Sequence, residues 1–115
     1  MLKKIAVSLA VAGLMLAPTV PGQAFFELGK TLKIKCFDDV NSHDRAFCMG
    51  YILGIADVMM EGNTVNNFKA CIPESAPEDK IWSNVTKFLK ANPGNLHYTA
   101  DDLVAFAFQE TFPCK

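Results

Sequence analysis

The chain has 115 residues, half of them hydrophobic, and its 11 Lys and Arg residues against 12 Asp and Glu residues give a formal charge of −1. This length suits a single domain. A charge so evenly balanced does not favour nucleic acid binding, which needs a clustered basic face, so we expect no nucleic acid partner.

Residues 1–24 have the pattern of a secretory signal peptide. Lys3 and Lys4 precede the apolar run IAVSLAVAGLMLA, and small residues end the segment, so we predict cleavage after Ala24. An uncleaved anchor is the alternative, but the run is shorter than the ~20 apolar residues that a membrane span needs. The domain 25–115 would carry 9 basic and 12 acidic groups and would have no membrane segment after cleavage.

All four cysteines fall in the predicted mature domain: Cys36, Cys48, Cys71 and Cys114. An even number in a small exported chain indicates two disulfides and an oxidising compartment. Such crosslinks help a small domain, whose core is limited. A zinc site is the alternative, but the spacing contains no C-x-x-C pair and no nearby pair of histidines, so we predict no metal site.

Hydrophobic periodicity predicts helices rather than strands along this domain. The first helix, 27–37, is short and amphipathic. The second extends over about 43–61, where Asn41 or Ser42 can cap its start and Gly62 can end it in a left-handed conformation.

A third and a fourth helix follow Cys71. Ser75 and Glu78 form an S-x-x-E capping box, with Pro77 in the first turn of the third helix. The fourth helix begins at Thr99, and Asp102 completes a weaker version of the same box. We therefore predict an all-α fold, a compact bundle of four to five short helices with two disulfides.

The central helix is apolar on every side, because the only charged residue in 46–60 is Asp57. Such a helix is surrounded by protein or lipid, and this one is too short for a membrane span. Gly50 and Gly54, one turn apart, would let another helix backbone come close. Three other helices are too few to cover every side of this central helix within one chain, so we predict a homodimer in which a second subunit covers the rest. A buried Asp57 would need a hydrogen-bond partner, such as a helix N-terminus, a tyrosine or Trp82.

The sequence offers no catalytic constellation. His43 and Asp44 form an HD pair, but metal-dependent phosphohydrolases need further histidines, and only His97 remains. Oxidised cysteines provide no thiolate nucleophile. Asp57 and Glu61 could form a carboxylate pair, but Glu61 lies at the helix end. We predict that the protein is not an enzyme and has no cofactor.

The segment ANPGNLHY, residues 91–98, connects the last two helices. The simple interpretation is an interhelical turn. The functional interpretation is a protruding recognition loop with Leu96, His97 and Tyr98 exposed, because binding residues are often on loops and tyrosine is a frequent interface anchor.

Four segments in this order, FCMGYILGIAD, CIP, VTKFLKANP and ADDLVAFAFQETFPC, resemble the Rap/Tai family of type VI secretion amidase immunity proteins. The family pattern contains C-x-G-Y-I-x-G-x-x-D, C-x-P, a helix that ends near N-P or H-P, and a terminal F-P-C. The resemblance covers 32–114. We expect the first motif to contribute structural residues, namely Gly50, Tyr51, Gly54 and Asp57.

The resemblance implies a periplasmic, all-helical, disulfide-bonded and often homodimeric protein without catalytic residues. It would bind a peptidoglycan amidase delivered by neighbouring cells and block the cleft with the Cys/His catalytic pair. The resemblance also implies that the segment between the last two helices enters this cleft. The predicted partner-binding residues are Pro93, Asn95, Leu96, His97 and Tyr98.

Four cysteines allow three disulfide connectivities. We expect Cys36 with Cys48, which would attach the first helix to the central one, and Cys71 with Cys114, which would hold the C-terminus.

A small helical periplasmic chaperone of the acid-stress type is the alternative function. Such proteins expose apolar surface when a dimer dissociates at low pH. Two disulfides and only two histidines fit this class less well, because a crosslinked fold has less apolar surface to release.

Overall fold

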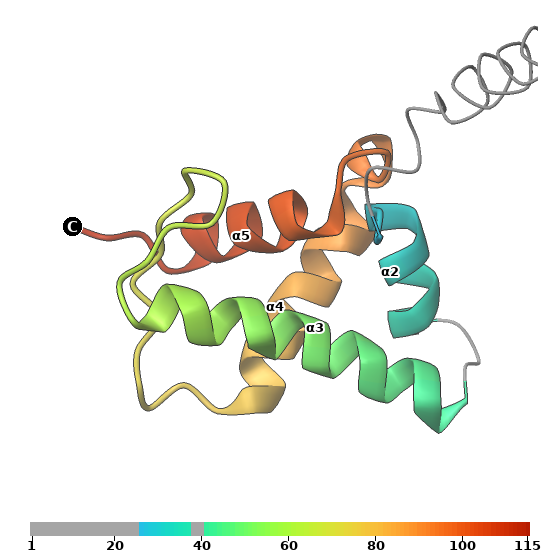
Figure 1. The fold of residues 1–115 in the computed structure, drawn as a ribbon, viewed down its shortest axis with the longest axis horizontal. Helices are drawn as coiled ribbons and strands as arrows, with labels where there is room; N and C mark the ends of the chain where they lie inside the picture. Colours follow the sequence, from blue (N-terminus) through green and yellow to red (C-terminus); the bar gives the residue numbers. More distant parts are fainter. Residues whose placement is uncertain (1–25, 38–40) are drawn as a thin grey trace, which may run out of the picture.

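A computed structural model describes residues 26–37 and 41–115, so the predicted signal peptide and its cleavage site lie outside the described residues. The chain forms helices α2 (Gly29–Phe37), α3 (Ser42–Met60), α4 (Glu78–Ala91) and α5 (Ala100–Thr111), with a short 3-10 helix, η2 (Pro93–Asn95), before α5 (Figure 1). Apart from two isolated bridges, the described part has no β-structure, which confirms the all-α prediction.

Each of the four α-helices contacts the other three. In Figure 1, α3 and α5 extend across the view one above the other, and α2 stands at the end where α5 begins. All four helices contribute to one core, because each turns an apolar side inward. The largest fully buried side chains are Phe108, Leu32, Ile52, Met59, Leu89, Val85, Val104 and Cys48.

Local sequence signals place the ends of α3 as predicted. Asn41 is the N-cap, and its side-chain oxygen accepts a hydrogen bond from the Asp44 amide at 2.8 Å. Gly62 follows the helix with φ of +89°, a left-handed conformation that favours glycine.

The predicted capping box of α4 is wrong. The helix begins at Glu78, and Pro77 is its N-cap with φ −72° and ψ 150°. A helix capped by Ser75 would need Ala76 in the helical region, and the residue before a proline is disfavoured there. The start of α5 is as predicted, with Thr99 as N-cap, but the predicted capping box of Thr99 and Asp102 is wrong, because the Thr99 side chain makes no capping hydrogen bond.

Two disulfides join the cysteines as predicted. Cys36 with Cys48 connects α2 to the first half of α3, and Cys71 with Cys114 fastens the segment after α3 to the C-terminus. Their Cα atoms are 5.4 and 5.0 Å apart, which is usual for a disulfide.

One side of α3 remains exposed in the single chain. It consists of Phe47, Gly50, Gly54, Asp57 and Val58, which we call the exposed α3 face. The expectations of a buried Asp57 and of a close helix at the glycines are wrong within one chain: Asp57 is exposed, and a Cβ at either glycine would meet no atom within 4 Å. The other helices cover only the opposite side, formed by Cys48, Ile52, Ala56 and Met59. In the described part of the chain, no helix has both the length and the apolarity of a membrane span.

Candidate partner-binding site

The loop 93–98 between α4 and α5 is a compact series of turns. The Asn92 side-chain amide donates to the Phe88 carbonyl at 2.8 Å at the end of α4. The Asn95 amide then donates to the Asn92 carbonyl and the Tyr98 amide to the Asn95 carbonyl, both at 3.1 Å. These bonds satisfy backbone groups that a helix end leaves without partners.

The same loop is fastened to the start of α2. The amide of Gly29 donates to the carbonyl of Tyr98, and the amide of Lys30 donates to the carbonyl of Leu96, both at 2.9 Å. The first amides of a helix have no acceptor within the helix, so the loop supplies one for two of them. Loop 93–98 is therefore part of the bundle and not a loose connection.

Most of the predicted partner-binding residues are exposed. Pro93, Asn95, His97 and Tyr98 lie at the surface, with Tyr98 51% exposed and its ring centroid 4.2 Å from that of His97. The expectation that Leu96 is exposed is wrong. Its side chain is half-buried and packs against the core, while its carbonyl accepts a hydrogen bond from the amide of Lys30 in α2.

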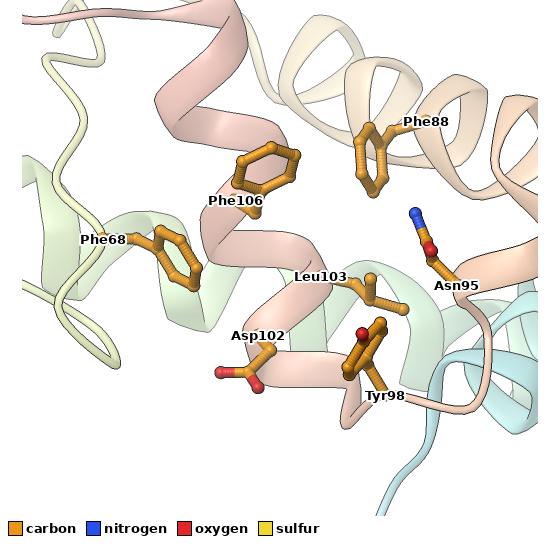
Figure 2. Close-up of a pocket in the computed structure, with 7 residues that line it drawn as sticks. All are labelled: Phe68, Phe88, Asn95, Tyr98, Asp102, Leu103 and Phe106. Atoms are coloured by element: carbon orange, nitrogen blue, oxygen red, sulfur yellow. The ribbon is translucent and has the colours of Figure 1, made fainter.

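A pocket of about 310 Å³ lies beside this loop, and the sequence did not indicate it. We call it the aromatic pocket; it is lined by Phe68, Phe88, Asn95, Tyr98, Asp102, Leu103 and Phe106. Figure 2 shows the Phe106 ring between those of Phe68 and Phe88. The Phe106 centroid is 5.6 Å from Phe68 and 5.7 Å from Phe88, both in edge-to-face geometry, which is favourable for aromatic pairs.

A tight turn places Phe68 at the pocket. Val65 and Phe68 form an isolated bridge, and Asn66 and Asn67 between them have φ of 50° and 68°. Positive φ at both central residues defines a type I′ turn, and asparagine tolerates this conformation better than most residues. The Asn-Asn pair in GNTVNN is the signal that could have predicted the turn. It does not predict that the turn places Phe68 beside Phe106 of α5.

Asn66 also links this turn to α5. Its side-chain nitrogen donates to Asp101 Oδ2 at 2.9 Å and to Asp102 Oδ1 at 2.6 Å. Desolvation opposes ionisation of Asp101, but hydrogen bonds from Asn66, from Thr99 and from backbone amides outweigh it and keep the pKa of this carboxyl below its ordinary value of 3.8. The positive end of the α5 dipole favours both carboxylates.

The candidates for catalysis remain dispersed. His43 and Asp44, 3.7 Å apart, lie at the start of α3, where the His43 side chain is 89% exposed. Asp57 and Glu61 are both exposed near the other end of that helix. Within the described residues, no group of three His, Cys, Asp or Glu side chains could hold a metal ion.

The structure is a small helical bundle with two disulfides, in which an exposed loop lies beside an aromatic pocket. The chain belongs to the family of Rap1a immunity proteins, whose family model matches residues 28–114. Among curated proteins none matches the chain significantly.

Family membership bears on function, because an immunity protein binds a cognate effector. It agrees with the resemblance in the sequence and supports a role in binding instead of catalysis. The two disulfides are consistent with an exported protein, since they persist in oxidising compartments.

Proposed function

We propose that the protein is a periplasmic immunity protein, exported by a cleaved signal peptide, that inhibits a type VI secreted peptidoglycan amidase. Loop 93–98 occupies the active-site cleft of that enzyme. The observation that carries the proposal is the exposure of His97 and Tyr98 on a loop that hydrogen bonds fasten to α2. A loop already in its bound conformation loses little conformational entropy on binding.

The inhibition is steric in this proposal. Tyr98 and His97 fill the cleft and keep the substrate from the catalytic pair of the amidase, so no residue of the immunity protein takes part in chemistry. Tyrosine is a common hot spot because it adds a large contact area with few rotatable bonds.

The test uses a peptidoglycan amidase with a Cys/His catalytic pair, sought first among the products of the neighbouring genes. We expect a one-to-one complex of this enzyme with each immunity subunit and loss of peptidoglycan hydrolysis. His97→Ala with Tyr98→Ala should weaken the complex at least about tenfold, which is about 1.4 kcal/mol. His43→Ala is the matched control, because His43 is the other histidine and is exposed far along the chain, on α3. Full affinity after the double substitution would exclude loop 93–98 as the inhibitory element.

We further infer that two copies associate through the exposed α3 face. Phe47 and Val58 are 39% and 43% exposed there, and the space above Gly50 and Gly54 is open. Two small residues one turn apart allow close approach of a second helix. Gly54→Leu should give a monomer in sedimentation experiments, whereas Ala91→Leu, exposed at the end of α4, should leave the dimer intact. A monomeric unmodified protein at micromolar concentration would contradict the inference.

The exposed α3 face also favours the chaperone alternative, because apolar surface that appears on dissociation could hold unfolding proteins. The disulfides oppose it, since they restrain the fold from opening further. Retention of unfolding client proteins in acidic buffer, without any amidase complex, would support the chaperone.

A further inference from the structure

The aromatic pocket combines three phenyl rings with a carboxylate. The rings of Phe68, Phe88 and Phe106 all line it, with Phe106 between the other two, and the Asp102 side chain lies nearer the start of α5 (Figure 2). Among the residues that the structure describes, the pocket is lined by no lysine, arginine or histidine. The local chemistry is therefore apolar with one negative charge.

The combination of aromatic rings and one carboxylate restricts which chemical groups can bind in the pocket. An anion would be repelled by Asp102, and a purely apolar group would remove water from that carboxylate without giving it a partner, which is unfavourable. A cation with a flat apolar surface satisfies both parts of the pocket, because it can stack on the rings and pair with the carboxylate.

The hydrogen bonding of Asp102 leaves room for such a partner. Asn66 donates to Asp102 Oδ1 at 2.6 Å, whereas a carboxylate has two oxygens with about four acceptor sites. The volume of about 310 Å³ is at the lower limit of ligand pockets and suits one long side chain.

We propose that the aromatic pocket binds the guanidinium group of an arginine side chain on the surface of the effector. The planar guanidinium stacks on the ring of Phe106 and donates hydrogen bonds to Asp102, while Tyr98 at the rim of the pocket continues into the contact made by loop 93–98. This inference rests on the proposed function, because it names the side chain by which the same surface recognises its partner.

The experiment is a nuclear magnetic resonance titration of the full mature protein with N-acetyl-arginine amide. The neutral isostere N-acetyl-citrulline amide is the control ligand. We expect saturable shifts at Phe68, Tyr98, Asp102 and Phe106 with the arginine probe, and binding of the citrulline probe at least about fivefold weaker, because the charge-assisted hydrogen bonds to Asp102 are lost. Equal binding of the two probes, or no shift with arginine amide, overturns the proposal.

Two adjacent variants test the role of the carboxylate. Asp102→Asn removes the charge in the pocket but keeps an oxygen that can accept from Asn66. Asp101→Asn removes the same charge one residue away, at a side chain that does not line the pocket. Asp102→Asn should weaken arginine binding at least about fivefold, because the hydrogen bonds to the guanidinium are no longer charge-assisted on both sides. Asp101→Asn should change it less than about twofold, because the Asp101 carboxylate does not line the pocket and solvent screens its charge there. Equal effects of the two substitutions would show that only the general charge matters and would overturn the proposal.

Phe106→Leu adds a second measurement, because it keeps an apolar side chain and removes the ring on which the guanidinium stacks. It should weaken arginine binding, and unchanged binding in this variant contradicts the stacking. The titration needs no effector, so it separates the two proposals. If arginine amide binds but no amidase complex forms, the arginine-binding pocket stands and the proposed amidase partner is refuted. If an amidase complex forms but arginine amide does not bind, only the arginine-binding pocket is refuted.

Discussion

The backbone of Gly29 lies directly against that of Leu96. A Cβ at position 29 would stand 3.0 Å from the Leu96 carbonyl oxygen and 3.1 Å from its Cα, and it would also overlap the side chain of Leu103. The hydrogen bond from Lys30 to Leu96 closes the same contact. A residue without a side chain is thus required where α2 meets loop 93–98.

Gly29→Ala should therefore both destabilise the fold and displace the loop. We expect the free energy of unfolding to fall by about 1–3 kcal/mol, since the backbone of Leu96 has to move. Affinity for the effector should fall as well, although no binding residue is changed. Denaturant unfolding and titration with the effector measure the two effects.

Gly50→Ala is the control for this substitution, with both variants made in the Gly54→Leu background, because Gly50 belongs to the exposed α3 face through which two copies are proposed to associate. A Cβ at Gly50 meets no atom within 4 Å, and alanine favours an exposed helix position over glycine by up to about 1 kcal/mol. The stability of the single chain should rise. If Gly29→Ala behaves in the same way, the contact with Leu96 is not tight.

The helices were predictable because they follow from local rules. The ends of α3 depend on Asn41 and Gly62, and both signals act within a few residues. The start of α4 was misplaced because two local rules conflict there. Ser75 favours a cap, but the proline at position 77 disfavours helix at the preceding residue, and the steric rule decides.

The site was only partly predictable because it depends on which segments meet. The sequence indicated a loop at 93–98, and four of the five residues predicted there are exposed. The aromatic pocket joins Phe68, Phe88 and Phe106 from three segments, and no local pattern specifies that juxtaposition. The exposure of Asp57 was missed for the same reason, since composition cannot tell which side of an apolar helix its neighbours cover.

Stability in acid should depend on Asn66. The pKa of Asp101 is lowered in the folded state, so its ionised form stabilises the fold above the unfolded value of 3.8, and this contribution is lost as pH falls through the folded pKa. Asn66→Ala removes one of the hydrogen bonds that lower this pKa. We expect lower stability at neutral pH and a smaller loss of stability on acidification, measured by thermal unfolding from neutral to acidic pH.

Asn67→Ala is the matched control, because Asn67 also has positive φ but gives no hydrogen bond to Asp101 that the structure records. It should lose turn stability while it keeps the acid dependence of the unmodified protein. Identical acid profiles for the two variants would mean that Asn66 acts only through the turn.

Stability at alkaline pH should depend on Tyr51. Burial raises the pKa of Tyr51 from 10.0 to about 12, and the negative charges of Asp101 and Glu27 act in the same direction. The unfolded chain then ionises Tyr51 before the folded chain does, so stability is complete below pH 10 and falls as pH rises towards about 12. Tyr51→Phe should reduce this alkaline loss in thermal unfolding. Tyr98→Phe, at an exposed position, should leave it unchanged; equal profiles for all three proteins would contradict the assignment.

The two disulfides should differ in how they stabilise the fold. Their cysteines are 12 and 43 positions apart, so loop entropy assigns about 3 kcal/mol to Cys36 with Cys48 and about 4 kcal/mol to Cys71 with Cys114. The burial of the cysteines favours the opposite ranking of the two disulfides. Cys36 and Cys48 are 3% and 0% exposed, whereas both cysteines of the other pair are at the surface.

Replacing Cys36 and Cys48 by alanine should therefore cost more than the loop entropy. Two buried sulfur atoms leave space in the core, and each adds about 1 kcal/mol. Trp82 also loses its partner, because its indole donates to Cys48 Sγ at 3.2 Å, and as the only tryptophan it reports the change by fluorescence. We expect denaturant unfolding to rank this pair of substitutions as at least as destabilising as Cys71→Ala with Cys114→Ala. If Cys71→Ala with Cys114→Ala is instead the more destabilising pair, by the difference that loop entropy alone predicts, then the core closes around the missing sulfur atoms of Cys36 and Cys48.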